Sequence, residues 1–345
     1  MKVSHVLQVR HSHPVLHLPP RDSLRAAVRR VVQVSSSSTR RRWGRRVAIV
    51  GGLAVIAALA VVALTFRRQL ASYLTHWRGA PDHTWPYQKH AEEPVVHLAF
   101  AGDTGDAGEE VQATADAMQM IGSAEHYDAL VLLGDLVYPS GDATMLDTHV
   151  FEPFDGVLHE GTDLLAVLGN HDVMLGEGDD MMRRLGMSGR WWQRVIGDVT
   201  VIGLDTTRVD DPVQLAFLEN TLESADTTWT IVAMHHPPYS AGYQGSSIDA
   251  RRAFAPLFEQ YGVQLVLAGH DHDYQRSEVI NGVTYVVSGA GSGTRRTGTE
   301  DFTAVSFAFL HFVDVAAYDD HLVVRAVGAD REVADEFTLV PAGVP

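Results

Sequence analysis

The sequence contains no cysteine among its 345 residues, which excludes a disulfide framework and a thiolate metal site. A chain of this length can bury a sizeable core without disulfides, so their absence leaves the cellular compartment open. Asparagine is also scarce. Asn170, Asn220 and Asn281 are the three present, and none lies in an Asn-x-Ser/Thr sequon, so nothing indicates a eukaryotic N-glycoprotein.

Positive charge is scarce after residue 46. Residues 1–46 hold eleven Lys or Arg and one acid, Asp22, whereas the remainder carries a formal charge of -26 within a total of -16. Nucleic-acid phosphates are held by Lys and Arg, so the acidic part argues against nucleic acid as a partner. The basic segment 1–46 is rich in Arg and His and has a serine run, which predicts a disordered cytoplasmic tail.

Residues 47–66 form an uncharged apolar run of 20 residues, about the length that crosses roughly 30 Å of hydrocarbon as a helix. Five arginines between residues 40 and 46 precede this run, which predicts a cytoplasmic N-terminus and an extracytoplasmic remainder. The alternatives are a buried core helix and a cleavable signal peptide. The run is apolar on every side and no clear small-x-small cleavage site follows closely, which favours an uncleaved membrane anchor. Residues 67–93, with Trp77 and Trp85, then form a juxtamembrane linker.

From residue 94 to residue 345 the pattern predicts one catalytic domain in which short apolar strands alternate with helices. Helices are expected at 108–122, 213–224 and 248–261. Such an order is typical of a layered α/β domain with mixed sheets and covering helices. The expected strands are 95–101, 129–133, 164–168, 199–204, 229–234 and 263–268, followed without intervening helices by 283–288, 306–314, 321–327 and 335–340.

Five short polar motifs follow expected strands, at the sheet edge where open α/β sheets place their sites. Each is weak alone, because a Gly-Asp pair after a strand is often only a turn. Together they present Asp, Asn, His and Tyr, and carboxylates and imidazoles are ligands of Zn, Fe and Mn. The motifs are Gly102-Asp103-Thr104-Gly105, Gly134-Asp135-Leu136-Val137-Tyr138, Gly169-Asn170-His171-Asp172, Val232-Ala233-Met234-His235 (followed by His236), and Gly269-His270-Asp271-His272.

The geometry of these motifs suits two neighbouring ions. Asp135 can bridge two ions with its two oxygens, and strand alternation sends His270 and His272 to one side with Asp271 pointing away. The glycines permit sharp turns close to the metals. The other histidines of the domain are interpreted as ordinary satisfied polar residues: His97, His126, His149, His159, His311 and His321.

The five motifs resemble those of the calcineurin-like metallophosphoesterase superfamily over residues 95–275. More narrowly they look like the purple acid phosphatases, whose pattern is GDxG, GDxxY, GNH(D/E), VxxH and GHxH. The resemblance implies a β-sandwich of two mixed sheets flanked by helices. Most superfamily members have a histidine ligand where this chain has Gly105, and Tyr138 supplies a phenolate instead, which favours trivalent iron.

Carried over residue by residue, the resemblance implies a two-metal centre of Fe(III) and a divalent ion, which would be Fe, Zn or Mn. The Fe(III) ligands would be Asp103, Asp135, Tyr138 and His272. The divalent ion would be bound by Asp135, Asn170, His235 and His270, with Asp135 bridging the two.

The resemblance also implies a phosphate ester as substrate. Hydroxide held by the metals would attack phosphorus, and His171, oriented by Asp172, would donate a proton to the leaving oxygen or bind the phosphoryl group. His236 is the second candidate for this role. Small family members place a further histidine after VxxH, but here Gln244 lies near that position as a candidate substrate-binding residue.

The function expected from the sequence is hydrolysis of phosphate monoesters outside the membrane. A phosphodiesterase or a phosphoprotein phosphatase on the same fold remains an alternative, because loops decide substrate choice. A non-catalytic surface binding module is the third hypothesis. This hypothesis predicts that some metal ligands are absent from the sequence, whereas all seven candidate metal ligands are present.

Overall fold

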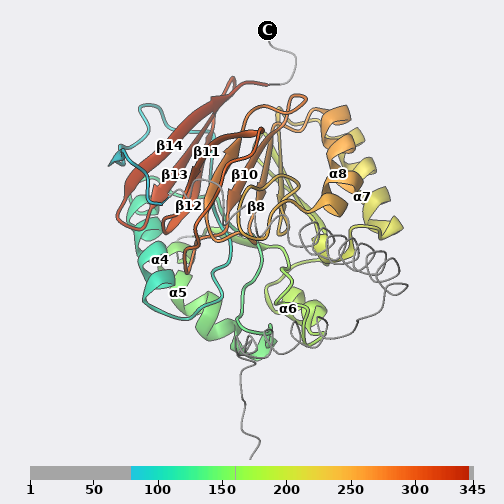
Figure 1. The fold of residues 1–345 in the computed structure, drawn as a ribbon, viewed down its shortest axis with the longest axis horizontal. Helices are drawn as coiled ribbons and strands as arrows, with labels where there is room; N and C mark the ends of the chain where they lie inside the picture. The colour runs from blue at the N-terminus through green and yellow to red at the C-terminus, as the bar shows by residue number, and fades with distance from the viewer. Residues whose placement is uncertain (1–78, 160, 342–345) are drawn as a thin grey trace, which may run out of the picture. The chain divides into compact units, whose positions relative to one another are not determined.

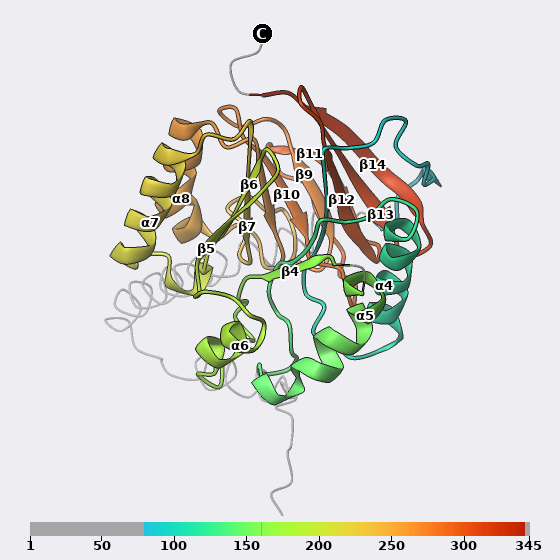
Figure 2. The same ribbon diagram turned by 180° about the vertical axis from the view of Figure 1, so that it is seen from behind.

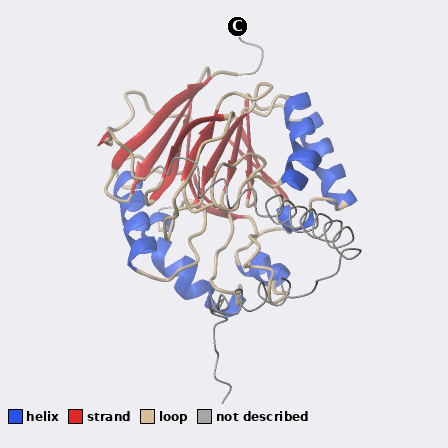
Figure 3. Ribbon diagram, in the orientation of Figure 1, coloured by secondary structure: helices blue, strands red, loops and turns tan. Residues whose placement is uncertain are grey.

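A computed structural model of the chain describes residues 79–159 and 161–341. These residues form two seven-stranded mixed sheets that share a core, with helices on the outer faces (Figures 1 and 3). The strand order is β1-β14-β13-β12-β2-β3-β4 in one sheet and β11-β9-β10-β8-β7-β6-β5 in the other. The predicted class, two mixed sheets flanked by helices, is confirmed for this part of the chain.

The first sheet joins parallel strands from the start of the domain to antiparallel strands from its end. β2 pairs in parallel with β3 and antiparallel with β12, so the end of the domain completes the sheet that its beginning starts. The strands are β1 (Trp85–Pro86), β2 (Val96–Ala101), β3 (Ala129–Leu132), β4 (Asp163–Ala166), β12 (His311–Ala317), β13 (Leu322–Gly328) and β14 (Glu332–Leu339).

The second sheet has a parallel centre, in which β6, β7, β8 and β10 run together, and antiparallel edges. Its strands are β5 (Trp192–Ile196), β6 (Val199–Gly203), β7 (Trp229–Met234), β8 (Leu265–Ala268), β9 (Tyr274–Ser277), β10 (Thr284–Ser288) and β11 (Thr303–Phe307).

Helices cover both outer faces, as Figure 2 shows from behind. α4 (Glu109–Gly122) and α5 (Glu152–Leu158) lie beside the first sheet, and α7 (Pro212–Ser224) and α8 (Ile248–Tyr261) cover the second. The remaining helical segments are short: Ala143–Met145, the π-helix Asp147–Phe151, α6 (Gly178–Arg184) and Thr206–Arg208.

The burial of β7 explains why its residues are apolar without interruption from Ile231 to Met234. Ile231 and Ala233 point into the core between the sheets, whereas Val232 and Met234 point into a second core under α7 and α8. A strand buried on both faces needs apolar residues at every position, so no polar alternation appears in the sequence.

Most expected elements are found. The first six strands agree with the expected ranges to within two residues, and the three helices to within one. The expected strand 306–314 is wrong, because the chain leaves β11 after Phe307 and enters the other sheet as β12 at His311. The apolar run continues through this crossing, so composition alone could not reveal it.

The predicted tail and the predicted membrane span lie outside the described residues. Among the residues that are described, no helix combines the length and apolar character needed to cross a bilayer. Part of the expected juxtamembrane linker packs on the domain: Trp85 and Pro86 pair with β14, and the Tyr87 hydroxyl donates to Glu125 at 3.0 Å.

Candidate metal centre

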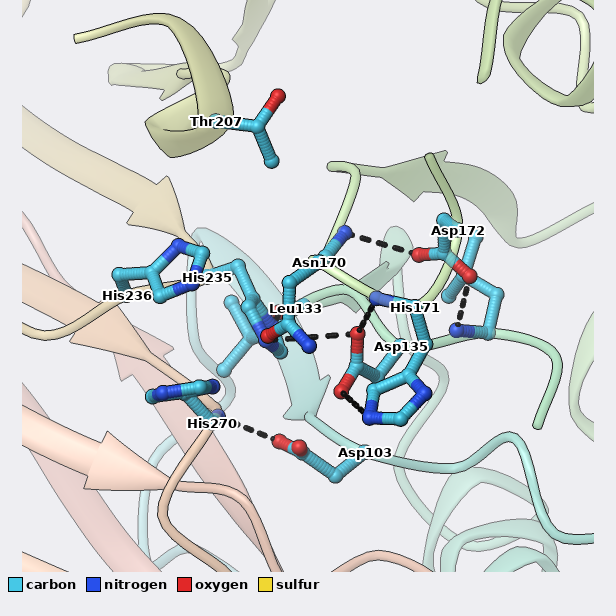
Figure 4. A network of polar contacts seen from close by, with 12 residues as sticks. Asp103, Leu133, Asp135, Asn170, His171, Asp172, Thr207, His235, His236 and His270 are labelled. Carbon is cyan, nitrogen blue, oxygen red and sulfur yellow. Dashed lines mark hydrogen bonds and ion pairs between the residues drawn. The ribbon is translucent and has the colours of Figure 1, made fainter. Parts of the chain in front are cut away.

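The five motifs meet in space, but they come from two sheets instead of one edge. Asp103, Asp135 and Asn170 follow β2, β3 and β4 of the first sheet. His235 and His270 follow β7 and β8 of the second sheet. Figure 4 shows these side chains converging between the strand ends. The site therefore lies where the carboxyl ends of both parallel groups meet.

Three of the candidate ligands have a left-handed backbone. The φ angles are 56° at Asp103, 53° at Asp135 and 71° at His270, a region that L residues rarely adopt. Such conformations persist where the surrounding structure fixes them, and they concentrate at functional sites. Gly169 allows the backbone to lie close to Asp135, since a Cβ at position 169 would lie 2.1 Å from Asp135 Oδ1. The backbone is thus shaped to turn these side chains inward.

One group of ligands surrounds the Tyr138 hydroxyl. Its oxygen lies 3.1 Å from Asp103 Oδ1, 3.2 Å from Asp135 Oδ2 and 3.2 Å from His272 Nε2. His272 Nε2 is also 3.3 Å from Asp103 Oδ1. These are the four residues that the resemblance to the purple acid phosphatases implies as ligands of one ion.

The second group lies on the other side of Asp135. His235 Nε2 is 3.2 Å from Asn170 Oδ1 and 3.5 Å from Asp135 Oδ1. The ring of His270 stands 5.1 Å from that of His235. Asp135 therefore turns Oδ2 toward the first group and Oδ1 toward the second, the arrangement that a bridging carboxylate needs.

The donor set fits two cations. The single phenolic proton of Tyr138 cannot fully satisfy two carboxylate oxygens at 3.1 and 3.2 Å, whereas a cation can. Ligand atoms each roughly 2.0–2.2 Å from one ion, at about right angles, lie about 3 Å apart, close to the observed spacings. Within the described residues, Asp103, Asp135 and His235 form one buried group of potential metal ligands.

Burial sets the protonation of the metal-free centre. It lowers the pKa of His270 to about 2, of His272 to about 4, and of His235 well below its ordinary value. Burial, followed by the charge of Asp135, raises the pKa of Asp103. The imidazoles are therefore neutral, the form in which histidine binds metals.

Two further carboxylates hold the loops together. Asp172 was expected to orient His171, but its oxygens accept from the backbone N–H of Gly169 and Leu136 at 2.8 Å and of Val137 at 3.3 Å. Burial, followed by the charge of Asp135, raises its pKa to about 8. It therefore joins two motif loops.

Asp271 points away from the two flanking histidines, as strand alternation predicted. It accepts hydrogen bonds from the Ser240 hydroxyl at 2.5 Å and from the backbone N–H of Gln244 at 2.6 Å. No sequence motif indicates this contact, because its partners are 27 and 31 residues away. Asp271 therefore fixes the loop that carries Gln244, whose own side chain is exposed.

The two candidate proton-transfer histidines are held differently. His171 Nδ1 lies 2.6 Å from the carbonyl oxygen of Pro139, and its Nε2 lies 3.9 Å from Asp135 Oδ2. His236 Nδ1 lies 2.7 Å from the hydroxyl of Thr206, a residue that no sequence motif indicated. Burial lowers the pKa of His236.

A separate buried group, His90, His97 and Asp314, also has the composition of a metal site. However, His97 Nε2 lies 2.7 Å from Asp314 Oδ1, and the Tyr127 hydroxyl donates to the same oxygen at 2.9 Å. These are direct hydrogen bonds, so protein groups already satisfy this Asp314 oxygen. The group is a polar network, which agrees with the interpretation of His97 as a satisfied core histidine.

Comparisons with known proteins agree with this geometry. Residues 96–274, just over half of the chain, match the calcineurin-like phosphoesterase family. Tartrate-resistant acid phosphatase type 5 of Oryctolagus cuniculus is 28% identical over 244 residues, covering 58% of this chain and 74% of that protein.

Two solved structures show the same fold. Purple acid phosphatase PPD1 from yellow lupin superposes with a TM-score of 0.64 at 20% identity, covering 71% of this chain and 53% of that one. GAP50, the anchor in the inner membrane complex of Plasmodium, superposes with a TM-score of 0.63 at 17% identity, covering 71% and 89%. The chain is a calcineurin-like metallophosphoesterase, distantly related to the tartrate-resistant and purple acid phosphatases.

Proposed function

We propose that this metallophosphoesterase hydrolyses phosphate monoesters with an Fe(III)–divalent metal centre. The observation that carries the proposal is the Tyr138 hydroxyl, which lies 3.1–3.2 Å from Asp103, Asp135 and His272. A phenolate is a hard oxygen donor suited to a trivalent ion. The divalent ion (Fe, Zn or Mn) would be held by Asp135, Asn170, His235 and His270.

Two ions at this centre would supply a clamp for phosphoryl oxygens and a lowered pKa for water. The protein's own contribution is positioning. The Asp135 carboxylate is held in place, because its Oδ1 also accepts the His171 backbone N–H at 2.9 Å. A fixed carboxylate would keep the two ion subsites at a constant distance from each other. Asp103 Oδ2 accepts the His270 backbone N–H at 2.7 Å, which ties the two sheets together at the centre.

His171 is the proposed general acid. A carbonyl oxygen only accepts, so His171 Nδ1 donates to Pro139, and the tautomer leaves Nε2 free toward the centre. When the ring is doubly protonated, Nε2–H can deliver a proton to the leaving alkoxide. His171 is half-buried, so an ester can reach it.

The substrate-facing loop departs from the small purple phosphatases. Gln244 stands near the position of their additional histidine, with its backbone held by Asp271. An amide can donate to a phosphate oxygen but does not change charge with pH. This loop therefore positions substrate without adding a titrating group.

We propose that this activity lies outside the membrane. The proposal is supported by the uncharged run 47–66 and the arginines before it. Protease added to intact cells should digest the catalytic domain and spare the N-terminal tail. Protection of the domain from protease until the membrane is lysed would show the opposite orientation.

A non-catalytic role is the competing function, since a fold neighbour is described as an anchor in a membrane complex. Such a role does not require a complete ligand set. This chain retains all seven candidate ligands, and their arrangement matches two ion subsites, which favours catalysis.

The test uses the purified full chain. Visible absorption and metal analysis on one sample should give a broad charge-transfer band, iron and a second ion, together with hydrolysis of p-nitrophenyl phosphate. Tyr138→Phe should remove the band. A colourless protein with two zinc or manganese ions, unchanged by Tyr138→Phe, would contradict the iron assignment. Preferred cleavage of bis(p-nitrophenyl) phosphate would identify a phosphodiesterase.

A further inference from the structure

The turn after β6 meets the candidate donor His236 because of strand register. β6 and β7 are parallel, Gly203 lies opposite Ala233, and the Leu204 N–H donates to the Ala233 carbonyl at 2.9 Å. Three residues beyond this pair, just past the ends of the two strands, the chain reaches Thr206 and His236. The paired strands therefore bring the two residues together.

Thr206 makes two hydrogen bonds to the same residue. Its hydroxyl oxygen accepts from the His236 backbone N–H at 3.0 Å and lies 2.7 Å from His236 Nδ1. If Nδ1 carried the proton, the hydroxyl would accept twice and its own proton would lack a partner in a buried place. Leaving a buried donor unpaired costs about 1–3 kcal/mol. The hydroxyl therefore donates to Nδ1.

Several hydrogen bonds stabilise the turn that contains Thr206. The Asp205 carboxylate accepts from the Thr207 N–H at 2.8 Å and from Arg190 at 3.2 Å. Gln214 accepts from the Asp205 N–H at 2.7 Å and donates to the Asp205 carbonyl at 3.0 Å. Asp205 and Gln214 are completely buried and Thr206 nearly so. The threonine hydroxyl is thus held in place.

The position of the His236 ring, close to two candidate metal ligands, makes its tautomer important. Figure 4 shows His236 beside His235 and on the same side as His270, and its ring lies 4.9 Å and 4.4 Å from theirs. These three histidines form a group with the spacing of a metal site. If Nδ1 accepts from Thr206, Nε2 carries the proton and cannot bind a cation.

We propose that Thr206 is a positioning residue that holds His236 as its Nε2–H tautomer, so that His236 donates to a phosphoryl oxygen and does not bind metal. The inference rests on the proposed phosphoesterase function. It separates the three histidines into two ligands, His235 and His270, and one donor.

The two non-ligand histidines then have complementary tautomers. His171 carries its proton on Nδ1, where Pro139 accepts it, and its Nε2 donates only when the ring is charged. His236 donates from Nε2 while neutral. One residue can bind the phosphoryl group throughout the cycle while the other moves a proton.

Two matched variants test the kinetic part. Thr206→Val keeps the shape but removes the hydroxyl, and Thr206→Ser keeps the hydroxyl. Loss of one donor to developing charge costs about 10²–10³-fold in kcat. We expect Thr206→Val to lower kcat about tenfold or more toward that limit, with both metals retained, and Thr206→Ser to restore it. Equal kcat values in the wild type and Thr206→Val would overturn the proposal.

A double-mutant cycle separates positioning from general stability. If Thr206 acts only through His236, then Thr206→Val should change kcat little in a His236→Ala background. A structural role would lower kcat by the same factor in both backgrounds, which would overturn the proposal.

The tautomer is read directly by ¹⁵N NMR of histidine-labelled, zinc-loaded full chain, with His236 identified by the signals lost in His236→Gln. The expected wild-type spectrum has a protonated Nε2 and an unprotonated Nδ1. A protonated Nδ1, or an Nε2 shifted by zinc, would overturn the proposal. Because this measurement needs no turnover, it remains decisive if the wild type hydrolyses no monoester or if Thr206→Val fails to fold.

Discussion

At the scale of single residues, Gly105 and Tyr138 depend on each other. The Gly105 carbonyl accepts the Tyr138 N–H at 2.9 Å. A Cβ at position 105 would lie 2.6 Å from the Asp135 carbonyl oxygen and 2.7 Å from the Val137 N–H nitrogen. The turn that delivers the tyrosine therefore occupies the space that a side chain at position 105 would need. The close contact therefore leaves room for glycine at position 105 and not for a histidine side chain.

Gly105→Ala should therefore destabilise the fold, by about 1–3 kcal/mol, as overpacking does. Thermal unfolding of the metal-free protein measures the change. Gly108→Ala is the matched control, because the nearest atom to a Cβ there is a flexible Glu110 oxygen at 3.5 Å. A Gly105→Ala variant as stable as Gly108→Ala would contradict this prediction, because it would show that the turn accommodates the added methyl group.

The motifs were enough to identify the candidate ligands, because glycine, aspartate and histidine after strands have a recognisable spacing. The groups that orient the proton-transfer histidines were not predictable. Thr206 is 30 residues from His236 and the Pro139 carbonyl is 32 residues from His171. A threonine and a backbone carbonyl carry no motif, so only the register of the strands reveals them.

At the scale of elements, the long helices were predictable, whereas the short helices and the two-residue strand β1 were not. α4, α7 and α8 have 13 or 14 residues and clear start signals, such as the Asp211 side chain that accepts from Val213 N–H. α5 and α6 have 7 residues each, too few for a periodic pattern to stand out. β1 is two residues long and depends on β14 for its partner.

The segment at 85–93 is fastened to the first sheet by a buried polar network. Asp314 on β12 lies 2.7 Å from His97 Nε2 and 3.1 Å from His90 Nε2. Burial alone would lower the pKa of His97 and raise that of Asp314. The attraction between the two groups outweighs burial, so the pKa of His97 rises and that of Asp314 falls well below its ordinary value. Each group therefore stabilises the other's charged form.

This network predicts a pH window of stability. Asp314 contributes above the ordinary Asp pKa and loses its contribution as the pH falls further, whereas His97 contributes below the ordinary His pKa and loses it as the pH rises. The difference between wild type and Asp314→Asn should then be largest between about pH 4 and pH 6.5. Breaking a buried pair costs about 3–5 kcal/mol.

Urea unfolding of both proteins from pH 3 to pH 9 measures this difference. His149→Gln, in a helix away from the network, should show no such window. A difference that is constant across the range would mean that the pair is uncharged. The titratable and charged groups around it are His90, His97, Tyr87, Tyr127, Glu125 and Arg325.

At the scale of the whole molecule, the candidate metal centre lies between two halves of the fold. The candidate ligands Asp103, Asp135 and Asn170 come from the first sheet, and His235 and His270 from the second. The chain after residue 46 is strongly acidic, so two bound cations would reduce the repulsion between the buried carboxylates of this site. Cations bound there would cross-link the sheets in the folded state only.

Metal removal should therefore lower the midpoint of thermal unfolding. A ligand at about 1,000 times its Kd stabilises the folded state by about 4 kcal/mol. For a domain of this size 1 kcal/mol corresponds to roughly 2–4 °C, so chelation should lower Tm by about 10 °C. Asp135→Asn, which disturbs both subsites, should lose most of this metal dependence, whereas His321→Gln should keep it. A Tm that is the same with and without metal would mean that the two sheets hold the ligands in place unaided, and that the ions serve the chemistry alone.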